Sequence, residues 1–198
     1  IVELLIPFFL AFEGRRPQAR ELVVLAVMCA LAVAGRVAIP IPSFKAIFGI
    51  IMIAGIAFGP ESGFLVGAIS ALASNFFYSQ GPYTPWQMMA YGAGGMLAGF
   101  VFAEGRLPRK PVVMGIFGFL AVAFFVGPLL DTCSVFLVMS RISLKGAMAF
   151  YISGFPVNLR QAVATAIVLL VLGKPLLEKL DRIKTKYGIL DDEGWKEA

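Results

Sequence analysis

The chain has 198 residues, of which 59% are hydrophobic and 15% are charged, and its formal net charge is +5. Soluble domains average roughly 45–50% apolar and 25% charged residues, so this composition excludes an ordinary soluble domain and predicts a polytopic membrane protein. The sequence has no histidine and only two widely separated cysteines, which excludes His-based hydrolase triads, HExxH zinc sites and CxxC redox sites.

Residues 1–19 are interpreted as the end of an additional N-terminal helix followed by a cytoplasmic hinge. The stretch from Ile1 to Phe12 is apolar apart from Glu3 and too short to cross a bilayer. Three arginines follow by residue 20, and short basic loops favour the cytoplasmic side. Because the basic residues stand in short loops between apolar runs rather than on a soluble face, no nucleic-acid partner is predicted.

Residues 20–173 predict a membrane domain of six spans. A spanning helix rises about 1.5 Å per residue and needs roughly 20 residues to cross a hydrocarbon core of ~30 Å. The longest charge-free run, from Ser62 to Ala103, has 42 residues and therefore holds two spans. We expect bends at Gly127-Pro128 in the fifth span and at Pro156 in the sixth. The expected spans are 22–41, 46–60, the two halves of 62–103, 111–140 and 146–173.

The middle of the charge-free run is predicted to be a hairpin tip. Residues 80–85 contain one glycine and two prolines, which break a helix and favour a turn. Amides near hydrocarbon are costly unless they find partners, so their density here favours a ligand pocket over the alternative, an ordinary belt of interfacial aromatic residues. The amides belong to Asn75, Gln80 and Gln87, and the aromatic residues around them are Tyr78, Tyr83, Trp86 and Tyr91.

Further polar and ionisable residues are expected in the outer half of the membrane domain, where such residues are functional candidates. Arg160 lies 13 residues before Gly173, which places it about 20 Å above the inner boundary at helical rise, and Asp131 is expected at a similar height. An Asp131–Arg160 ion pair is therefore predicted, either as a structural lock or as a ligand contact. The other members of this group are Arg36, Lys45, Arg141 and Asn158.

Small residues recur at helical spacing on several expected spans. Ala26, Ala30 and Ala34 form a stripe that lets another helix approach closely, either from a partner protein or from the same chain. A set of glycines with the same spacing is interpreted as tight helix contacts within the fold. None of them precedes a Lys-Ser or Lys-Thr pair, so no phosphate-binding loop is predicted, and we do not expect the chain to hydrolyse ATP by itself. These glycines are Gly59, Gly63, Gly67, Gly95 and Gly99.

Residues 174–198 have a different pattern from the spans. Apolar residues from Leu176 to Tyr187 recur at helical spacing with lysines and arginines between them. This pattern predicts an amphipathic helix lying on the cytoplasmic membrane surface, and the alternative is a docking helix for a partner. The last residues, 191–198, are expected to be a solvated tail.

One stretch resembles a known transporter family. Ser74-Asn75-Phe76-Phe77 is followed by Gln80-Gly81-Pro82-Tyr83-Thr84-Pro85-Trp86-Gln87 and then by a glycine-rich span. This arrangement resembles the substrate-binding S components of energy-coupling factor (ECF) vitamin transporters, and within them the branch assigned to cobalamin uptake. Tyr83 stands where that branch is expected to have tryptophan. The resemblance covers residues 12–104 with specific motifs and the rest by hydropathy alone.

The resemblance implies an all-α bundle of six transmembrane helices in a prokaryotic cell membrane, with a cytoplasmic C-terminus. It implies a non-catalytic subunit, without a covalently bound cofactor, that captures cobalamin outside and topples against a transmembrane coupling subunit to release it inside. Two partner ATPase subunits would supply the energy. The stripe of Ala26, Ala30 and Ala34 is expected to contact the coupling subunit. The residues expected to bind substrate are Arg36, Lys45, Asn75, Gln80, Tyr83, Trp86, Gln87, Tyr91, Asp131, Asn158 and Arg160.

Two alternatives remain open for the function. The first is an S component for a different vitamin. The second is a self-sufficient secondary transporter or channel that uses the region of Asp131 and Arg160 as an ion or proton site and needs no partner ATPase. An intramembrane enzyme is not favoured, because the sequence has no histidine and no convincing pair of nucleophile and base.

Overall fold

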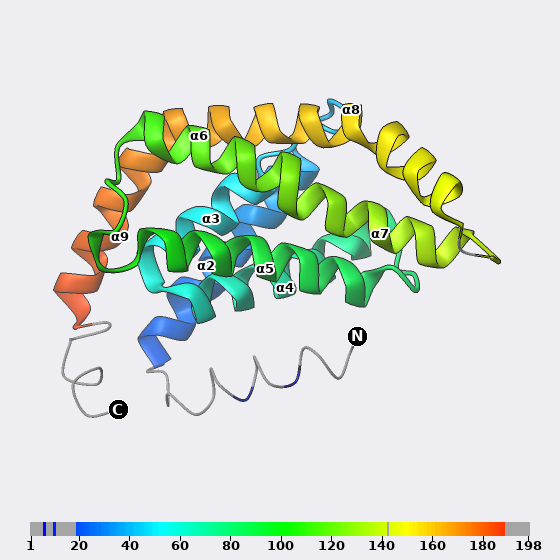
Figure 1. The fold of residues 1–198 in the computed structure, drawn as a ribbon. Helices are drawn as coiled ribbons and strands as arrows, with labels where there is room; N and C mark the ends of the chain where they lie inside the picture. Colours follow the sequence, from blue (N-terminus) through cyan, green and yellow to red (C-terminus); the bar gives the residue numbers. More distant parts are fainter. Residues whose placement is uncertain (1–5, 7–9, 11–18, 142, 189–198) are drawn as a thin grey trace.

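The computed structural model describes residues 6, 10, 19–141 and 143–188, and all regular structure in these ranges is helical. Figure 1 shows the helices packed into one bundle. The expected N-terminal helix and C-terminal tail lie almost entirely outside the described residues. The helices are α2 (Ala19–Val37), α3 (Ile47–Phe58), α4 (Pro60–Tyr78), α5 (Thr84–Phe102), α6 (Pro111–Ala121), α7 (Gly127–Val138), α8 (Leu144–Val168) and α9 (Lys174–Tyr187), with a 3₁₀ turn at Ala103–Gly105.

The described ranges contain six continuous helical segments, because α6 continues into α7 and α8 continues into α9. The joining segments are π-helical turns at Val122–Val126 and Leu169–Gly173. Two segments, Pro111–Val138 with 28 residues and Leu144–Tyr187 with 44, are long and apolar enough to cross a membrane by length and composition. The all-α prediction is therefore confirmed, and the six helical segments follow the expected order.

Helix α3 lies at the centre of the bundle, and all twelve of its residues are buried. The helix carries no charged residue, and a helix that is apolar on every side is stable only when other helices surround it. Figure 1 shows α2, α4, α5, α6 and α8 around it. Its central position thus explains why the helix is apolar on every side.

Glycines allow α3, α4 and α5 to approach each other at backbone distance. A β-carbon added at Gly55 would lie 2.1 Å from the carbonyl oxygen of Gly95, and one added at Gly63 would lie 2.5 Å from the same atom. Such distances are far shorter than any van der Waals contact, so only glycine fits there. The interpretation as tight helix contacts is confirmed for Gly63, Gly67, Gly95 and Gly99. Gly59 instead adopts φ 91° between α3 and α4, and an added β-carbon there would have no atom of the described residues within 4 Å.

The two positions where a bend was expected differ in their local helix type. The π-helical turn at Val122–Val126 directly precedes Gly127-Pro128, where a bend was expected. Proline lacks a backbone N–H and cannot complete the regular hydrogen-bond ladder, and π-helical turns are common where that ladder is disturbed. At Pro156, by contrast, α8 continues as an α-helix, and the irregular turn comes later, at Leu169–Gly173.

Helix α9 packs against the bundle rather than presenting its apolar side to a membrane surface. Leu177 and Leu180 are buried in the hydrophobic core. The Nζ atom of Lys184 donates to the carbonyl oxygen of Ala57 at 2.7 Å, at the C-terminal end of α3, where a cation complements the helix dipole. Arg20 on α2 donates to the carbonyl oxygen of Tyr187 at 3.3 Å. This amphipathic helix was expected to lie on a membrane surface. In the structure its contacts are instead with α3 and α2.

Candidate functional site

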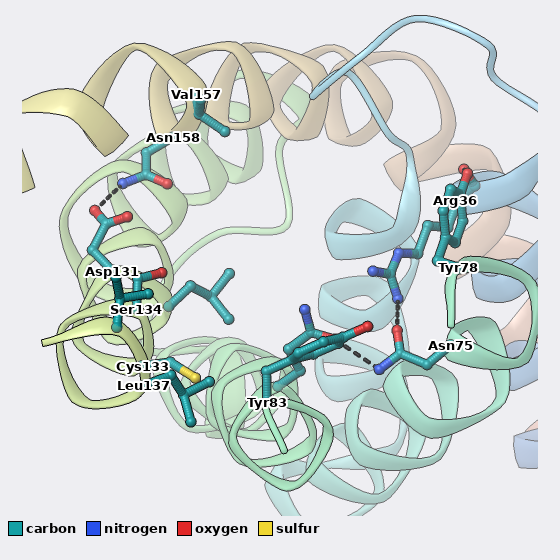
Figure 2. A pocket seen from close by; sticks show the side chains of 13 residues that line it. Arg36, Asn75, Tyr78, Tyr83, Asp131, Cys133, Ser134, Leu137, Val157 and Asn158 are labelled. Atoms are coloured by element: carbon teal, nitrogen blue, oxygen red, sulfur yellow. Dashed lines mark hydrogen bonds between the residues drawn. The ribbon is translucent and has the colours of Figure 1, made fainter. Parts of the chain in front are cut away.

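A cavity of about 430 Å³ opens at the end of the bundle opposite α9. Figure 2 shows its two walls: the ends of α2 and α4 with the start of α5 form one, and α7 with the middle of α8 forms the other. The lining combines aromatic and aliphatic side chains with a few polar groups, as is usual for small-molecule sites. The lining residues are Arg36, Asn75, Tyr78, Tyr83, Gln87, Leu130, Asp131, Cys133, Ser134, Leu137, Val138, Val157 and Asn158.

Arg36, at the end of α2, places a fixed positive charge in the first wall. Its Nη1 atom donates to Ser74 Oγ at 2.5 Å and to Asn75 Oδ1 at 2.9 Å. Its guanidinium carbon also lies 5.0 Å from the ring centroid of Tyr78 and 5.6 Å from that of Tyr91, within the range of a cation–π contact. Two hydrogen bonds and two aromatic rings therefore hold the guanidinium in place.

Asn75 connects Arg36 to the start of α5. Its side chain is 0% exposed, and a buried amide is costly unless its donors and its acceptor find partners. Asn75 Nδ2 donates to Thr84 Oγ1 at 3.1 Å and to Gln87 Oε1 at 2.9 Å, while Oδ1 accepts from Arg36. The amide thus has partners on both sides and ties three helices together.

The hairpin tip between α4 and α5 is held by its own hydrogen bonds. Thr84 Oγ1 donates to Gln80 Oε1 at 2.9 Å and accepts from the backbone N–H of Gly81 at 3.2 Å. Tyr83 Oη donates to the carbonyl oxygen of Ser79 at 2.7 Å. Ser79 itself has φ 76°, a backbone conformation that residues other than glycine rarely adopt. The predicted hairpin tip is confirmed, and its side chains fix the position of Tyr83.

Asp131 and Asn158 form the polar centre of the second wall. Asn158 Nδ2 donates to Asp131 Oδ2 at 2.7 Å, as Figure 2 shows. Two glycines make room for this pair: a β-carbon at Gly127 would lie 2.5 Å from Asn158 Cγ, and one at Gly154 would lie 2.2 Å from Asp131 Oδ1. Each polar side chain therefore packs against a glycine of the opposite helix.

This arrangement is suited to binding a small molecule by hydrogen bonds and aromatic contacts. Within the part of the chain that the structure describes, no group of three or more His, Cys, Asp or Glu residues is placed to hold a metal ion. Both cysteines are buried free thiols, as expected from their apolar surroundings. The polar groups that line the cavity include the three amides of Asn75, Gln87 and Asn158, one guanidinium and one carboxylate.

Comparison with family models gives a match over residues 17–178 to the ECF-type riboflavin transporter, S component. The chain belongs to this family. ECF S components are non-catalytic, substrate-binding membrane subunits that work with a transmembrane coupling subunit and ATPases in the prokaryotic cell membrane. Comparisons with curated proteins and with solved structures give no match. The family model names riboflavin, so it gives the expected cobalamin specificity no support and favours the alternative of a different vitamin.

Six of the residues predicted to bind substrate line the cavity of this S component. They come from five helices and from the hairpin tip, so they are distant in the sequence and close together in the fold. The six residues are Arg36, Asn75, Tyr83, Gln87, Asp131 and Asn158.

Five other predicted residues do not line the cavity. Lys45 donates to the carbonyl oxygen of Ile39 in the loop after α2, and Gln80 donates to that of Leu72 at 3.1 Å. Trp86 turns toward α7, where its Nε1 atom donates to the carbonyl oxygen of Leu129 at 2.6 Å. The remaining two are Tyr91, which is buried beneath Arg36, and Arg160, which is exposed.

The predicted Asp131–Arg160 ion pair is wrong. Asp131 pairs with Asn158 instead, and no salt bridge joins it to Arg160 among the described residues. Two residues along an α-helix correspond to about 200° of rotation at 3.6 residues per turn, so Asn158 and Arg160 point in nearly opposite directions. The height of Arg160 along its helix could be estimated from the sequence, but the direction of its side chain around the helix could not.

The predicted substrate-binding residues leave out Tyr78, although it was named among the aromatic residues of the hairpin tip, and they leave out most of the α7 side of the cavity of this S component. Leu130, Ser134 and Leu137 follow each other at helical spacing on the α7 face that also carries Asp131. Extending the prediction by three residues from Asp131 reaches Ser134, and steps of three and four residues from Ser134 reach Leu137 and Leu130. The remaining lining residues, Cys133, Val138 and Val157, carry no signal in the sequence.

The alanine stripe on α2 faces away from the bundle. Ala26, Ala30 and Ala34 are all exposed. The neighbouring apolar residues Val23 and Val27 are 64% and 53% exposed. The stripe is therefore not used for packing within the described part of this S component.

Gly154→Ala is expected to weaken substrate binding about 10-fold. The added methyl group would lie 2.2 Å from Asp131 Oδ1 and would displace the carboxylate from Asn158. Loss of a hydrogen bond to a charged group costs about 1.5–3 kcal/mol, which corresponds to at least a tenfold change in affinity. Alanine also favours a helix more than glycine does by about 1 kcal/mol. Calorimetric titration and thermal unfolding of the same variant should therefore show weaker binding without a matching loss of stability, and unchanged binding would contradict the role assigned to the pair.

Proposed function

We propose that this S component captures a flavin-type vitamin, riboflavin in the first instance, in the cavity between α5 and α7. The observation that carries this proposal is the size and lining of the cavity, taken with the family name. Its volume of about 430 Å³ falls within the range of roughly 300–1,000 Å³ that suits drug-sized ligands. A flavin is a planar ring system with a short polar chain, which suits aromatic walls and a few polar groups.

Cobalamin is the competing substrate, favoured by the resemblance of the hairpin tip to another branch of the family. In the fold, polar side chains of that motif donate hydrogen bonds to backbone carbonyl groups of the same chain. Gln80 bonds the carbonyl oxygen of Leu72, and Trp86 bonds that of Leu129. A corrinoid with its nucleotide tail is also far larger than a flavin. These two observations support the flavin over cobalamin.

The proposed orientation places the cavity on the outer side and α9 on the cytoplasmic side. Short loops rich in lysine and arginine favour the cytoplasm. Basic residues gather at the end of the bundle that carries α9, on the start of α2, on the loop before α6 and on α9 itself. They are Arg20, Arg106, Arg109, Lys110, Lys174, Lys179, Arg182, Lys184 and Lys186.

The proposed route of transport is a change of tilt of the S component against the coupling subunit, with the alanine stripe of α2 in the contact. Small exposed residues allow two helices to approach closely in a membrane. The alternative is a self-sufficient transporter with an ion site in the region of Asp131 and Arg160. The predicted pairing of these two residues was the main argument for that site, and Asp131 does not pair with Arg160. Uptake by this chain in vesicles without coupling and ATPase subunits would contradict the ECF route.

Calorimetric titration of the purified chain with riboflavin, cobalamin, folate and pantothenate tests the substrate. We expect tight 1:1 binding of riboflavin alone. Arg36→Gln should weaken this binding about 10-fold or more, because it removes a charged donor from the cavity wall. Lys179→Gln is the matched control, since it removes a charge from the exposed side of α9. Binding of cobalamin in place of riboflavin would overturn the proposed substrate and keep the family.

A further inference from the structure

The hydrogen-bond partners around the cavity determine which polar atoms remain for a ligand. Arginine is only a donor, so Asn75 must turn its Oδ1 atom to Arg36 and its Nδ2 atom to α5. Gln87 must then turn Oε1 to Asn75 Nδ2, as the 2.9 Å contact shows. Because Gln87 lines the cavity, the amide group that it offers to a ligand is the donor Nε2.

The second wall has the opposite polarity by the same reasoning. An ionised carboxylate only accepts hydrogen bonds, so Asn158 must turn Nδ2 to Asp131. Asn158 then offers its acceptor Oδ1 to the cavity, and Asp131 contributes further acceptor capacity. The wall of α2, α4 and α5 is therefore a donor wall, carrying Arg36 and Gln87. The wall of α7 and α8 is an acceptor wall, carrying Asp131 and Asn158.

We propose that this polarity fixes the direction in which the ligand binds and that Asn75 is the positioning residue that sets it. The inference rests on the proposed function and deepens it. A flavin has an acceptor-rich dione edge at one end of its ring system and a chain of hydroxyl donors attached to the ring. The dione edge faces Arg36 and Gln87, and the hydroxyl chain donates to Asp131 and Asn158. A ligand with the reverse distribution leaves both walls unpaired and is rejected, since unpaired buried polar groups are costly.

Asn75 qualifies as a positioning residue because it acts on the ligand through its neighbours. It is 0% exposed, and both sides of its amide are taken by Arg36, Thr84 and Gln87. Asn75→Asp keeps the shape and the contact with Arg36 but removes the donor. The carboxylate then accepts from Gln87 Nε2, which turns Gln87 Oε1 toward the ligand and reverses this part of the donor wall.

The test compares riboflavin with lumiflavin, which keeps the ring and its dione edge but has a methyl group in place of the hydroxyl chain. Gln87→Glu replaces the donor Nε2 by an acceptor of the same shape, and it should weaken both ligands about 10- to 100-fold, the range for a lost hydrogen bond to a charged or strongly polar group. Asp131→Asn changes the acceptor wall, and it should weaken riboflavin by the same range while changing lumiflavin less than about 3-fold. Ser153→Ala on α8 is the control, because that hydroxyl is exposed and bonds only the carbonyl oxygen of Phe150 in its own helix.

Asn75→Asp separates a positioning role from a merely structural one. If Asn75 acts by turning Gln87, this variant should weaken riboflavin and lumiflavin to the same extent as Gln87→Glu. In a Gln87→Met background, which has no amide to turn, Asn75→Asp should then weaken binding little further, because the two changes remove the same contact. Thermal unfolding of each variant identifies loss of fold, and Gln87→Glu, at a partly exposed position, keeps the test valid if Asn75→Asp does not fold.

The outcomes distinguish this inference from the proposed function. Both are supported if the unaltered chain binds riboflavin, if Gln87→Glu weakens the binding of both flavins, and if Asp131→Asn weakens riboflavin much more than lumiflavin. Riboflavin binding in which Asp131→Asn weakens lumiflavin as much as riboflavin, or in which Gln87→Glu has no effect, overturns the assigned direction and leaves the substrate standing. Absence of any flavin binding by the unaltered chain overturns the proposed function and this inference with it.

Discussion

Replacing Ala30 by tryptophan is expected to abolish vitamin uptake while leaving substrate binding unchanged. Ala30 is exposed on α2, between Ala26 and Ala34 on the same helix face. An indole in the middle of this stripe prevents the close helix approach that small residues allow. The cavity is not affected, because Ala30 does not line it. Uptake is measured in vesicles that contain the complete transporter, and binding is measured by titration of the purified variant.

Ile116→Trp is the matched control for Ala30→Trp. Ile116 is 58% exposed on α6 and places the same indole on an apolar face away from the alanine stripe. We expect this control to retain uptake, so that loss of uptake in Ala30→Trp is assigned to the stripe and not to an indole facing lipid. Equal loss of binding and uptake in Ala30→Trp would contradict the docking role, and full uptake would exclude it.

The second large effect is expected from Gly95→Ala, which should prevent stable packing of α4 on α5. A β-carbon at this position would lie 2.3 Å from the carbonyl oxygen of Gly63 and 2.7 Å from Ile51 Cγ2. A backbone carbonyl cannot turn aside as a side chain can, so the helices must separate. We expect a loss of about 3 kcal/mol, the upper end of the usual cost of overpacking. The loss is measured by thermal unfolding in detergent.

Gly94→Ala is the control for Gly95→Ala, because it adds the same methyl group one residue earlier. The nearest atom there is Val126 Cγ2, at 2.9 Å, which is the end of a side chain that can shift. A change of less than about 1 kcal/mol is expected, since small shifts relieve the contact. Similar destabilisation by both variants would contradict this explanation. The loss of stability would then follow from a methyl group added anywhere on this part of α5 and not from the contact between Gly95 and Gly63.

The helices could be predicted from the sequence because their signals are local. Apolar runs, the prolines and glycine of residues 80–85 and the four-residue spacing of glycines within single helices each depend only on neighbouring residues. The structure confirms the hairpin tip between Tyr78 and Thr84 and the close contact of the glycines. The family motif was equally local, and it led to the correct family but to a branch that the comparison does not support.

Which residues line the cavity could be predicted only in part, because this depends on the direction of each side chain around its helix. Gln87 lines the cavity, whereas the adjacent Trp86 turns to α7. Asn158 pairs with Asp131, whereas Arg160 points away. Adjacent helical residues differ by about 100° in direction, and the orientation of each helix is fixed only by its neighbours.

By itself, the sequence determined a helical membrane protein with six helical segments, a polar hairpin tip and glycine contacts between helices. The tertiary structure decided that α9 packs on α3, that the alanine stripe is exposed, and that Arg36, Asn75, Gln87, Asp131 and Asn158 form two walls of one cavity. The physical reason is that hydropathy and helix-breaking residues act along the chain. The partners of a buried amide or a charge come from helices far apart in sequence, and only their packing brings them within hydrogen-bond distance.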